Sequence, residues 1–381
     1  QAHSVKKLGA FASDLTAMSG FFSEGWEKPV SSGLSEEAQG WLLAEASFCL
    51  MSLGRMGEAI RPRQLTMRIR KKLKDWENAS TCAENLVDLL IPTGNLIEAK
   101  EEAERGIIVA DKSRLLHRQM VSHSKLAYTE HCLGNMDKAL EIFQEAEKMQ
   151  EKYDPEHPRL VSLAGTSYCT LLLDRAKEKK DKEDVLDRGK YSLEIFTQQQ
   201  ELLSIALDHL TIGRALERLN RIEEGRVELD KAVEGMKKAG KVEYLPMVLL
   251  ARAAFHRQQG EWEEARWNLD EAMEIAERCG LKLYEAEGVL LEANLNLDTL
   301  SKDGRVEKAR ESLNKADKLI REMKYGRRFA ELDLLSARVC YYEDNRSEAK
   351  EHFEKAIERI ESTGHYGLMR EVERVRAEIK I

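Results

Sequence analysis

The sequence lacks the features that indicate sheets, membrane spans and disulfide frameworks. Its 381 residues contain only six prolines, and long alternating runs of Val, Ile and Thr are missing, which argues against strands. No apolar run approaches the roughly 18 residues of a membrane helix, and no segment has the regions of a signal peptide. The six cysteines lie far apart without a Cys-x-x-Cys pair. We therefore expect separate reduced thiols and a cytoplasmic location.

Motifs for catalysis and for metal binding are also missing. The sequence contains no Gly-x-x-x-x-Gly-Lys-Ser/Thr run and no His-Glu-x-x-His, and its nine histidines do not cluster with cysteines at zinc spacing. His123 and His131 could share a helical face with Tyr128, but packing or surface polarity is the default interpretation of that trio. We expect that this chain is not an enzyme and binds no cofactor. The formal net charge of −8 argues against general nucleic-acid binding.

What is abundant favours helices. Charged residues make up 34% of the chain and hydrophobic ones 42%, with Ala, Glu, Leu, Lys and Arg dominating. A chain of this length exceeds one ordinary core, so we expect either several domains or one extended array. The composition therefore predicts an all-α protein.

One unit recurs along the chain: a turn residue, then a small marker residue five positions later that opens the second helix of a pair. Successive markers are separated by 40, 40, 46, 40, 40, 44 and 40 residues. The two longer intervals contain insertions, at 177–184 and around 300–304, and the first is expected to be a solvated loop. The pairs are Gly54/Ala59, Gly94/Ala99, Gly134/Ala139, Lys180/Val185, Asn220/Gly225, Gly260/Ala265, Gly304/Ala309 and Asp344/Ala349.

The second helices share a small-large-small pattern, as in Ala265, Leu269 and Ala272. With the turn Gly260-Glu-Trp262-Glu-Glu-Ala265, this pattern resembles the tetratricopeptide repeat (TPR), although the 40-residue period is longer than the usual 34 or so. The resemblance implies an all-α, right-handed superhelical solenoid of about eight helix pairs. We expect an N-terminal helical cap or junction to a preceding domain at 1–38, the solenoid at 39–363 and a capping helix at 364–381.

A second resemblance concerns several runs of sequence. They look like the TPR arrays that follow a NACHT- or STAND-type NTPase in bacterial signalling and antiviral defence proteins, and Gly20–Pro29 looks like the junction after such an NTPase. The resemblance implies a sensor region that binds a protein or peptide ligand and controls the attached module, with its own N-terminal domain as a second partner. The runs are Ser167–Asp174, Leu207–Ala215, Leu245–Ala254 and Leu269–Arg278.

Three other functions stay open: a free-standing scaffold or co-chaperone, the ligand-sensing region of a transcription regulator, and an accessory region that positions substrate for an enzyme. In each of them, recognition is expected on the concave side, which the first helices line. Counting back eleven and eight positions from each marker, and four further, gives the candidate partner-binding residues. They are Phe48, Glu84, Asp88, Tyr128, His131, Arg214, Glu217, Arg257, Arg338 and Tyr341.

Overall fold

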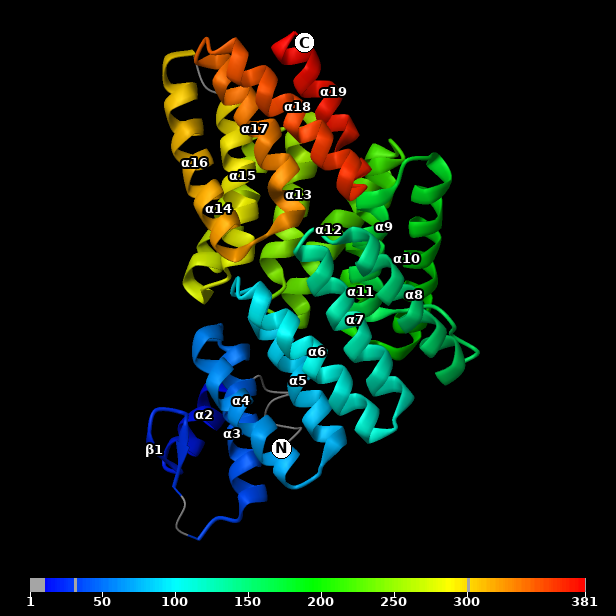
Figure 1. Ribbon diagram of the computed structural model, residues 1–381, viewed down its shortest axis with the longest axis vertical. Helices are drawn as coiled ribbons and strands as arrows, with labels where there is room; N and C mark the ends of the chain where they lie inside the picture. Colours follow the sequence, from blue (N-terminus) through cyan, green and yellow to red (C-terminus); the bar gives the residue numbers. More distant parts are fainter. Residues whose placement is uncertain (1–10, 31–32, 300–301, 381) are drawn as a thin grey trace.

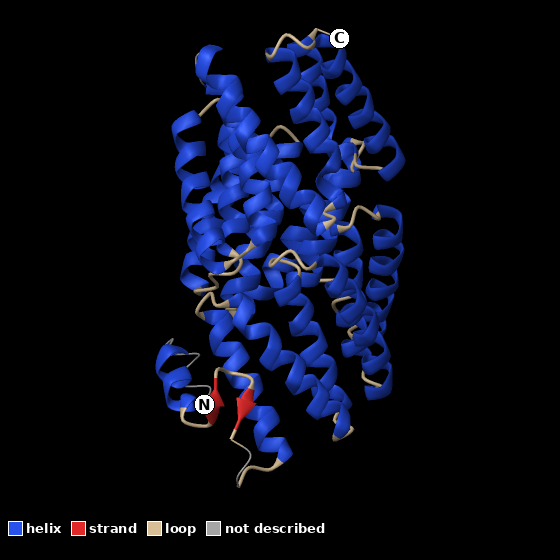
Figure 2. Cartoon of the chain, turned by 60° about the vertical axis from the view of Figure 1, so that its left-hand side comes forward, coloured by secondary structure: helices blue, strands red, loops and turns tan. Residues whose placement is uncertain are grey.

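The computed structural model describes residues 11–30, 33–299 and 302–380, and helices form almost all of it (Figures 1 and 2). The all-α solenoid of helix pairs is confirmed. The first helices are α3 (Glu36–Ser52), α5 (Trp76–Leu90), α7 (Leu116–Cys132), α9 (Ser162–Arg175), α11 (Leu202–Arg218), α13 (Leu245–Gln259), α15 (Lys282–Thr299) and α17 (Phe329–Tyr342). The second helices are α4 (Met56–Lys72), α6 (Leu96–Ser113), α8 (Met136–Tyr153), α10 (Lys179–Gln199), α12 (Ile222–Ala239), α14 (Trp262–Cys279), α16 (Lys302–Met323) and α18 (Arg346–Thr363).

Both ends of the array carry additional elements. At the N-terminal end, α2 (Phe11–Ser19) packs on α3, with the rings of Phe11 and Phe48 5.8 Å apart. A short antiparallel hairpin of β1 (Phe22–Glu24) and β2 (Lys28–Pro29) follows α2, so the expectation of no strands is wrong at this point. At the C-terminal end, the 3₁₀ turns η1 (Gly326–Arg328) and η2 (Tyr366–Leu368) precede α17 and α19 (Met369–Ile379).

The turn and marker residues explain why each pair closes tightly. Six turn residues have φ between 60° and 86°, a region that costs glycine nothing and that Asn and Asp tolerate. The markers that follow them are buried against the first helix, where a small side chain lets the two backbones approach. The six turn residues are Gly54, Gly94, Gly134, Asn220, Gly260 and Asp344.

The insertion at 177–184 is helical, which corrects the expectation of a solvated loop. The helix α10 already begins at Lys179, so Lys180 lies within its first turn instead of in a tight turn. Glu178 and Asp181 form a capping box that starts the helix early, because each side chain accepts from the other residue's backbone N–H. In the other long interval α16 begins at Lys302, so Gly304 is helical, while residues 300–301 lie outside the described part of the chain.

The array folds back on itself along a line of contacts that we call the seam. Along the seam, turns of the N-terminal pairs rest on turns of the C-terminal pairs, so that α7 contacts η1 and α9 contacts η2. Leu283 donates a backbone hydrogen bond of 3.0 Å to the Pro92 carbonyl across it. Close approaches join Gly54 to Cys279, Gly94 to Met323, Gly134 to Gly326, and Leu173 to Gly367.

Several further properties concern the whole described chain. All six cysteines are unpaired and buried, as expected. Every helix in the described ranges is too short or too polar to cross a bilayer. Within the same ranges, no three His, Cys, Asp or Glu side chains come together in a metal-binding arrangement.

Candidate functional site: the inner face of the solenoid

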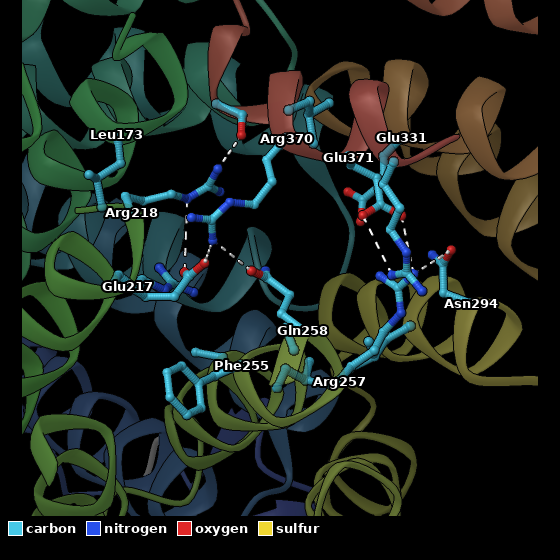
Figure 3. A pocket seen from close by; sticks show the side chains of 18 of the residues that line it. Leu173, Glu217, Arg218, Phe255, Arg257, Gln258, Asn294, Glu331, Arg370 and Glu371 are labelled. Carbon is cyan, nitrogen blue, oxygen red and sulfur yellow. Dashed lines mark hydrogen bonds and ion pairs between the residues drawn. The ribbon is translucent and has the colours of Figure 1, made fainter. Parts of the chain in front are cut away.

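The first helices of five pairs converge on a cavity of about 760 Å³, which we call the charged cavity (Figure 3). α9, α11, α13, α15 and α17 supply its walls, and α19 and both 3₁₀ turns complete it. Seven arginines and five carboxylates line it, an excess of two positive charges. The cavity therefore lies where the repeat pattern places the inner face, and its surface is strongly polar.

One wall of the charged cavity is an ion-pair network between α13, α15 and α19. Arg257 donates to Asp298 at 2.7 Å and to Glu371 at 3.1 Å (the latter shown in Figure 3). Arg374 also reaches Asp298, at 2.8 Å. Burial alone would raise the pKa of Asp298, but Arg257 and its neighbouring arginines outweigh it and lower the pKa to about 2. These carboxylates are therefore ionised and neutralise the arginines, which ties the C-terminal helix to the middle of the array.

A second network centres on Asp174, at the end of α9. Its carboxylate accepts from Arg327 at 2.6 Å and lies 2.8 Å from His131 Nε2 and 3.6 Å from His365 Nε2. Burial would raise the pKa of Asp174, but Arg327 and His365 outweigh it and hold that pKa well below its ordinary value. Burial, with Arg327, lowers the pKa of His131 to about 4. A charged Arg327–Asp174 pair beside a neutral His131 therefore joins α7, α9 and η1 across the seam.

Arg370 and Arg218 lie on the side of the cavity where α19 meets α11. Arg370 donates to Glu217 and to Gln258, each at 3.3 Å, and Arg218 donates to the Gly367 carbonyl (Figure 3). These bonds satisfy both guanidinium groups in part. They also place the positive ends of two long side chains at the edge of the same cavity.

Arg214 differs from the other arginines that line the charged cavity. It is half-buried on α11, and within the described residues it has neither a hydrogen bond nor an ion pair. Burial, with the nearby Arg327, lowers the pKa of Arg214 more than the carboxylates of Glu287 and Asp174 raise it, so the surroundings on balance disfavour the cation. A half-buried guanidinium without a hydrogen-bond acceptor, in a cavity of this size, therefore suits an anionic group from outside the chain.

A second cavity, of about 380 Å³, lies beside the first, and Thr170 lines both. We call it the tyrosine pocket, because Tyr128, Tyr244 and Tyr284 line it together with apolar residues of α7, α9 and α11. Among its charged residues, Asp88 is paired with Lys125 at 2.6 Å. The remaining charge on its wall is the carboxylate of Glu243, in the segment before α13.

The structure separates the sequence-predicted residues into three groups. Arg214, Glu217 and Arg257 line the charged cavity, whereas Asp88 and Tyr128 line the tyrosine pocket. Phe48 and Tyr341 are half-buried and line neither of these cavities. Three others line neither cavity and are buried and paired inside the protein, so the prediction that they are exposed on the groove is wrong: Glu84 with Arg118, His131 with Asp174, and Arg338 with Asp298 and Glu378. Glu217 and Arg257 are also buried and paired, with Arg370 and Asp298, although they line the charged cavity.

Several lining residues were missed by counting from the repeat markers. Asp174 stands at the end of a first helix, Arg327 lies in η1, and Arg370 and Glu371 lie in α19. Glu243 lies in the segment between α12 and α13. Asp174 stands eleven positions before the marker Val185, a counted position that the predicted set left out. The others occupy no counted position, because the seam, the C-terminal helix and the segment before α13 bring them to the inner face. The clustering of arginine at 327–328 and 370–376 is the signal in the sequence that could have suggested them.

Comparison with known proteins supports the fold. No protein-family model matches the sequence, and no curated protein matches it. A solved Rap protein complexed with competence and sporulation factor is similar in structure, with a TM-score of 0.55 and 14% identity over 91% of this chain and 99% of that chain. RapI in its apo form has a TM-score of 0.47 and 15% identity over 94% and 98%. A STAND protein with a TPR sensor from Pyrococcus horikoshii has a TM-score of 0.42 and 14% identity over 91% and 56%.

Four observations indicate the same fold. They are the repeated turn, the buried small markers, the stacked helix pairs and the similarity in structure. The chain has the fold of a tetratricopeptide-repeat array.

Proposed function

We propose that this array binds a protein or peptide on its inner face and places an acidic group of that ligand against Arg214. The observation that carries the proposal is the unpaired guanidinium of Arg214 in a cavity of about 760 Å³. The other arginines of the cavity have acceptors within the protein, so Arg214 is the arginine whose N–H donors are most available to a ligand. Charge-assisted bonds from arginine to a carboxylate are strong and can be bidentate.

The surroundings of Arg214 support a peptide-sized ligand. Phe255, Leu250 and Trp262 add apolar and aromatic surface to the same cavity, and such side chains are common anchors in protein interfaces. Gln258 supplies an amide group suited to a peptide backbone. The charged cavity therefore offers a peptide patches of apolar surface and one unpaired charge beside its paired ones.

Replacing Arg214 by Gln tests the proposal. Ligands captured from the source cell's lysate and identified by mass spectrometry should bind R214Q at least about tenfold more weakly than the unsubstituted chain, the loss expected for one buried charge-assisted bond. The melting temperature should stay equal or rise, because the substitution removes a half-buried charge that makes no hydrogen bond or ion pair with the described residues. R278Q, on the outer surface of α14, is the matched control and should bind normally.

Two outcomes would overturn this assignment. If R214Q captures the same ligand as tightly as the unsubstituted chain, Arg214 does not contact it. If R214Q melts at a clearly lower temperature, Arg214 stabilises the fold, and its role is structural instead of ligand binding.

We further propose that the array is the sensor region of a larger signalling NTPase. The runs that resemble arrays following NACHT- or STAND-type NTPases support this. The contacts along the seam link the N-terminal and C-terminal pairs, so ligand binding can act on the curvature of the array through them. A ligand that binds one curvature of the superhelix better than another shifts the population by its differential affinity. The test is nucleotide hydrolysis by the complete natural protein, with and without the captured ligand. A complete protein without an NTPase domain, or hydrolysis unaffected by the ligand, would contradict the proposal.

A further inference from the structure

The tyrosine pocket contains a buried carboxylate, Glu243, that the protein neutralises only in part. Glu243 is 7% exposed, and its Oε2 has no hydrogen-bond partner within the described residues. Its Oε1 has one cation nearby, Lys241 Nζ, at 3.9 Å. Burial raises the pKa of Glu243, which shows that the surroundings disfavour the ionised form. A positively charged hydrogen-bond donor strongly stabilises the ionised form of a buried carboxylate that has an oxygen without a hydrogen bond.

The other charged groups of the pocket do not compete for that role. Lys125 is held by Asp88 at 2.6 Å, so its ammonium group is already paired. Lys241 lies 5.7 Å from the ring of Phe48, outside the pocket lining. With two carboxylates and one ammonium group in the lining, the pocket carries an excess of one negative charge, opposite in sign to the charged cavity next to it.

The rest of the lining suits the apolar body of a cation. Burial raises the pKa values of Tyr128 and Tyr244 well above the ordinary value, so both rings stay neutral phenols whose faces attract positive charge. Leu160, Leu207 and Met247 add apolar surface. One further polar atom, Thr166 Oγ1, is buried without a hydrogen-bond partner among the described residues and can accept from an amine.

We propose that the tyrosine pocket binds an organic cation, a protonated amine on an aromatic or aliphatic body, with the ammonium group against Glu243. A free amine and the N-terminal residue of a peptide share this chemistry. The proposal goes beyond ligand binding at Arg214 and does not depend on it, because the groups that carry it lie in a different cavity.

Calorimetry at pH 8, where the carboxylate is most ionised, distinguishes charge recognition from simple filling of an apolar pocket. Phenethylamine should bind the unsubstituted chain at least about tenfold more tightly than its neutral analogue 2-phenylethanol. The substitution Glu243→Gln keeps the shape and removes the charge, so it should weaken amine binding about tenfold and leave the alcohol unchanged. Glu263→Gln, in the exposed first turn of α14, is the control and should change neither.

Two further arms identify the source of the amine and separate this proposal from the previous one. If peptides are the source, a peptide amide with a free N-terminal Phe should bind the unsubstituted chain more tightly than E243Q. Its N-acetylated form should show no such difference. If phenethylamine alone shows the difference, the site is for free amines. R214Q should bind phenethylamine normally, so the two proposals can fail independently. Equal affinity for amine and alcohol, no amine binding at millimolar concentration, or full affinity in E243Q would each overturn the proposal.

Discussion

The substitution Gly326→Ala should destabilise the protein more than any other single methyl group added at a glycine on its surface turns. A Cβ at Gly326 would lie 2.1 Å from the Leu133 carbonyl oxygen and 2.7 Å from its carbon, which are backbone atoms that cannot turn aside. Overpacking of this kind costs about 1–3 kcal/mol or more. The seam must therefore open at this point, with loss of the contact between α7 and η1.

Chemical denaturation measures this effect, and the chain offers a matched control. Gly304→Ala adds the same methyl group inside α16, where, beyond its chain neighbours and the backbone of its own helix, no atom of a described residue lies within 4 Å of the new Cβ. Alanine is the better helix former, so G304A should stabilise the protein by about 0.5–1 kcal/mol. Equal stabilities of G326A and G304A would mean that the seam is absent in solution. A destabilised G304A would mean that Gly304 belongs to a turn, as the repeat pattern predicts, and not to α16, where the structure places it.

The substitution Asp174→Ala should have the second large effect, because it leaves Arg327 buried without its carboxylate. Breaking a buried pair by removing one partner costs about 3–5 kcal/mol. His131 and His365 lose a partner as well. D174A should therefore unfold at lower denaturant concentration, while D137A, whose carboxylate is largely exposed and pairs with Arg175, should change stability by less than about 1 kcal/mol.

Acid should weaken the same network. The pKa of His131 falls from 6.5 in a model peptide to about 4 in the fold, so folding favours the neutral imidazole. That stability is complete above pH 6.5 and is lost as the pH falls through about 4, because the unfolded chain takes up the proton first. H131Q should show a smaller loss of stability than the unsubstituted chain between these values. The same acid dependence in both would mean that other groups cause the loss.

The repeat architecture could be predicted because its determinants are local. A turn residue with positive φ and a small residue five positions later are enough to close a pair, as at Gly260 and Ala265. The extra turns of α10 could not be predicted from the same pattern. They depend on the capping box of Glu178 and Asp181, which starts the helix in a segment whose mixed charges suggest a loop.

The site could be predicted only in part, for a related reason. The counted positions include Arg214 and Arg257, which line the charged cavity, because helix periodicity sets which face they share. The same counting predicts an exposed Arg338, but that side chain is 1% exposed and held by Asp298 and Glu378. Ion pairs between helices distant in sequence decide whether such a side chain is exposed or buried. The repeat pattern of a single chain does not specify them.

The central claim is that the ligand occupies the inner face at the charged cavity. Hydrogen exchange of the chain with and without the captured ligand tests this most directly. Protection should increase in α9, α11 and α13 and in the first turns of α19, the segments that line the cavity. Protection confined to the outer helices α12, α14 and α16, with the inner helices unchanged, would contradict the claim.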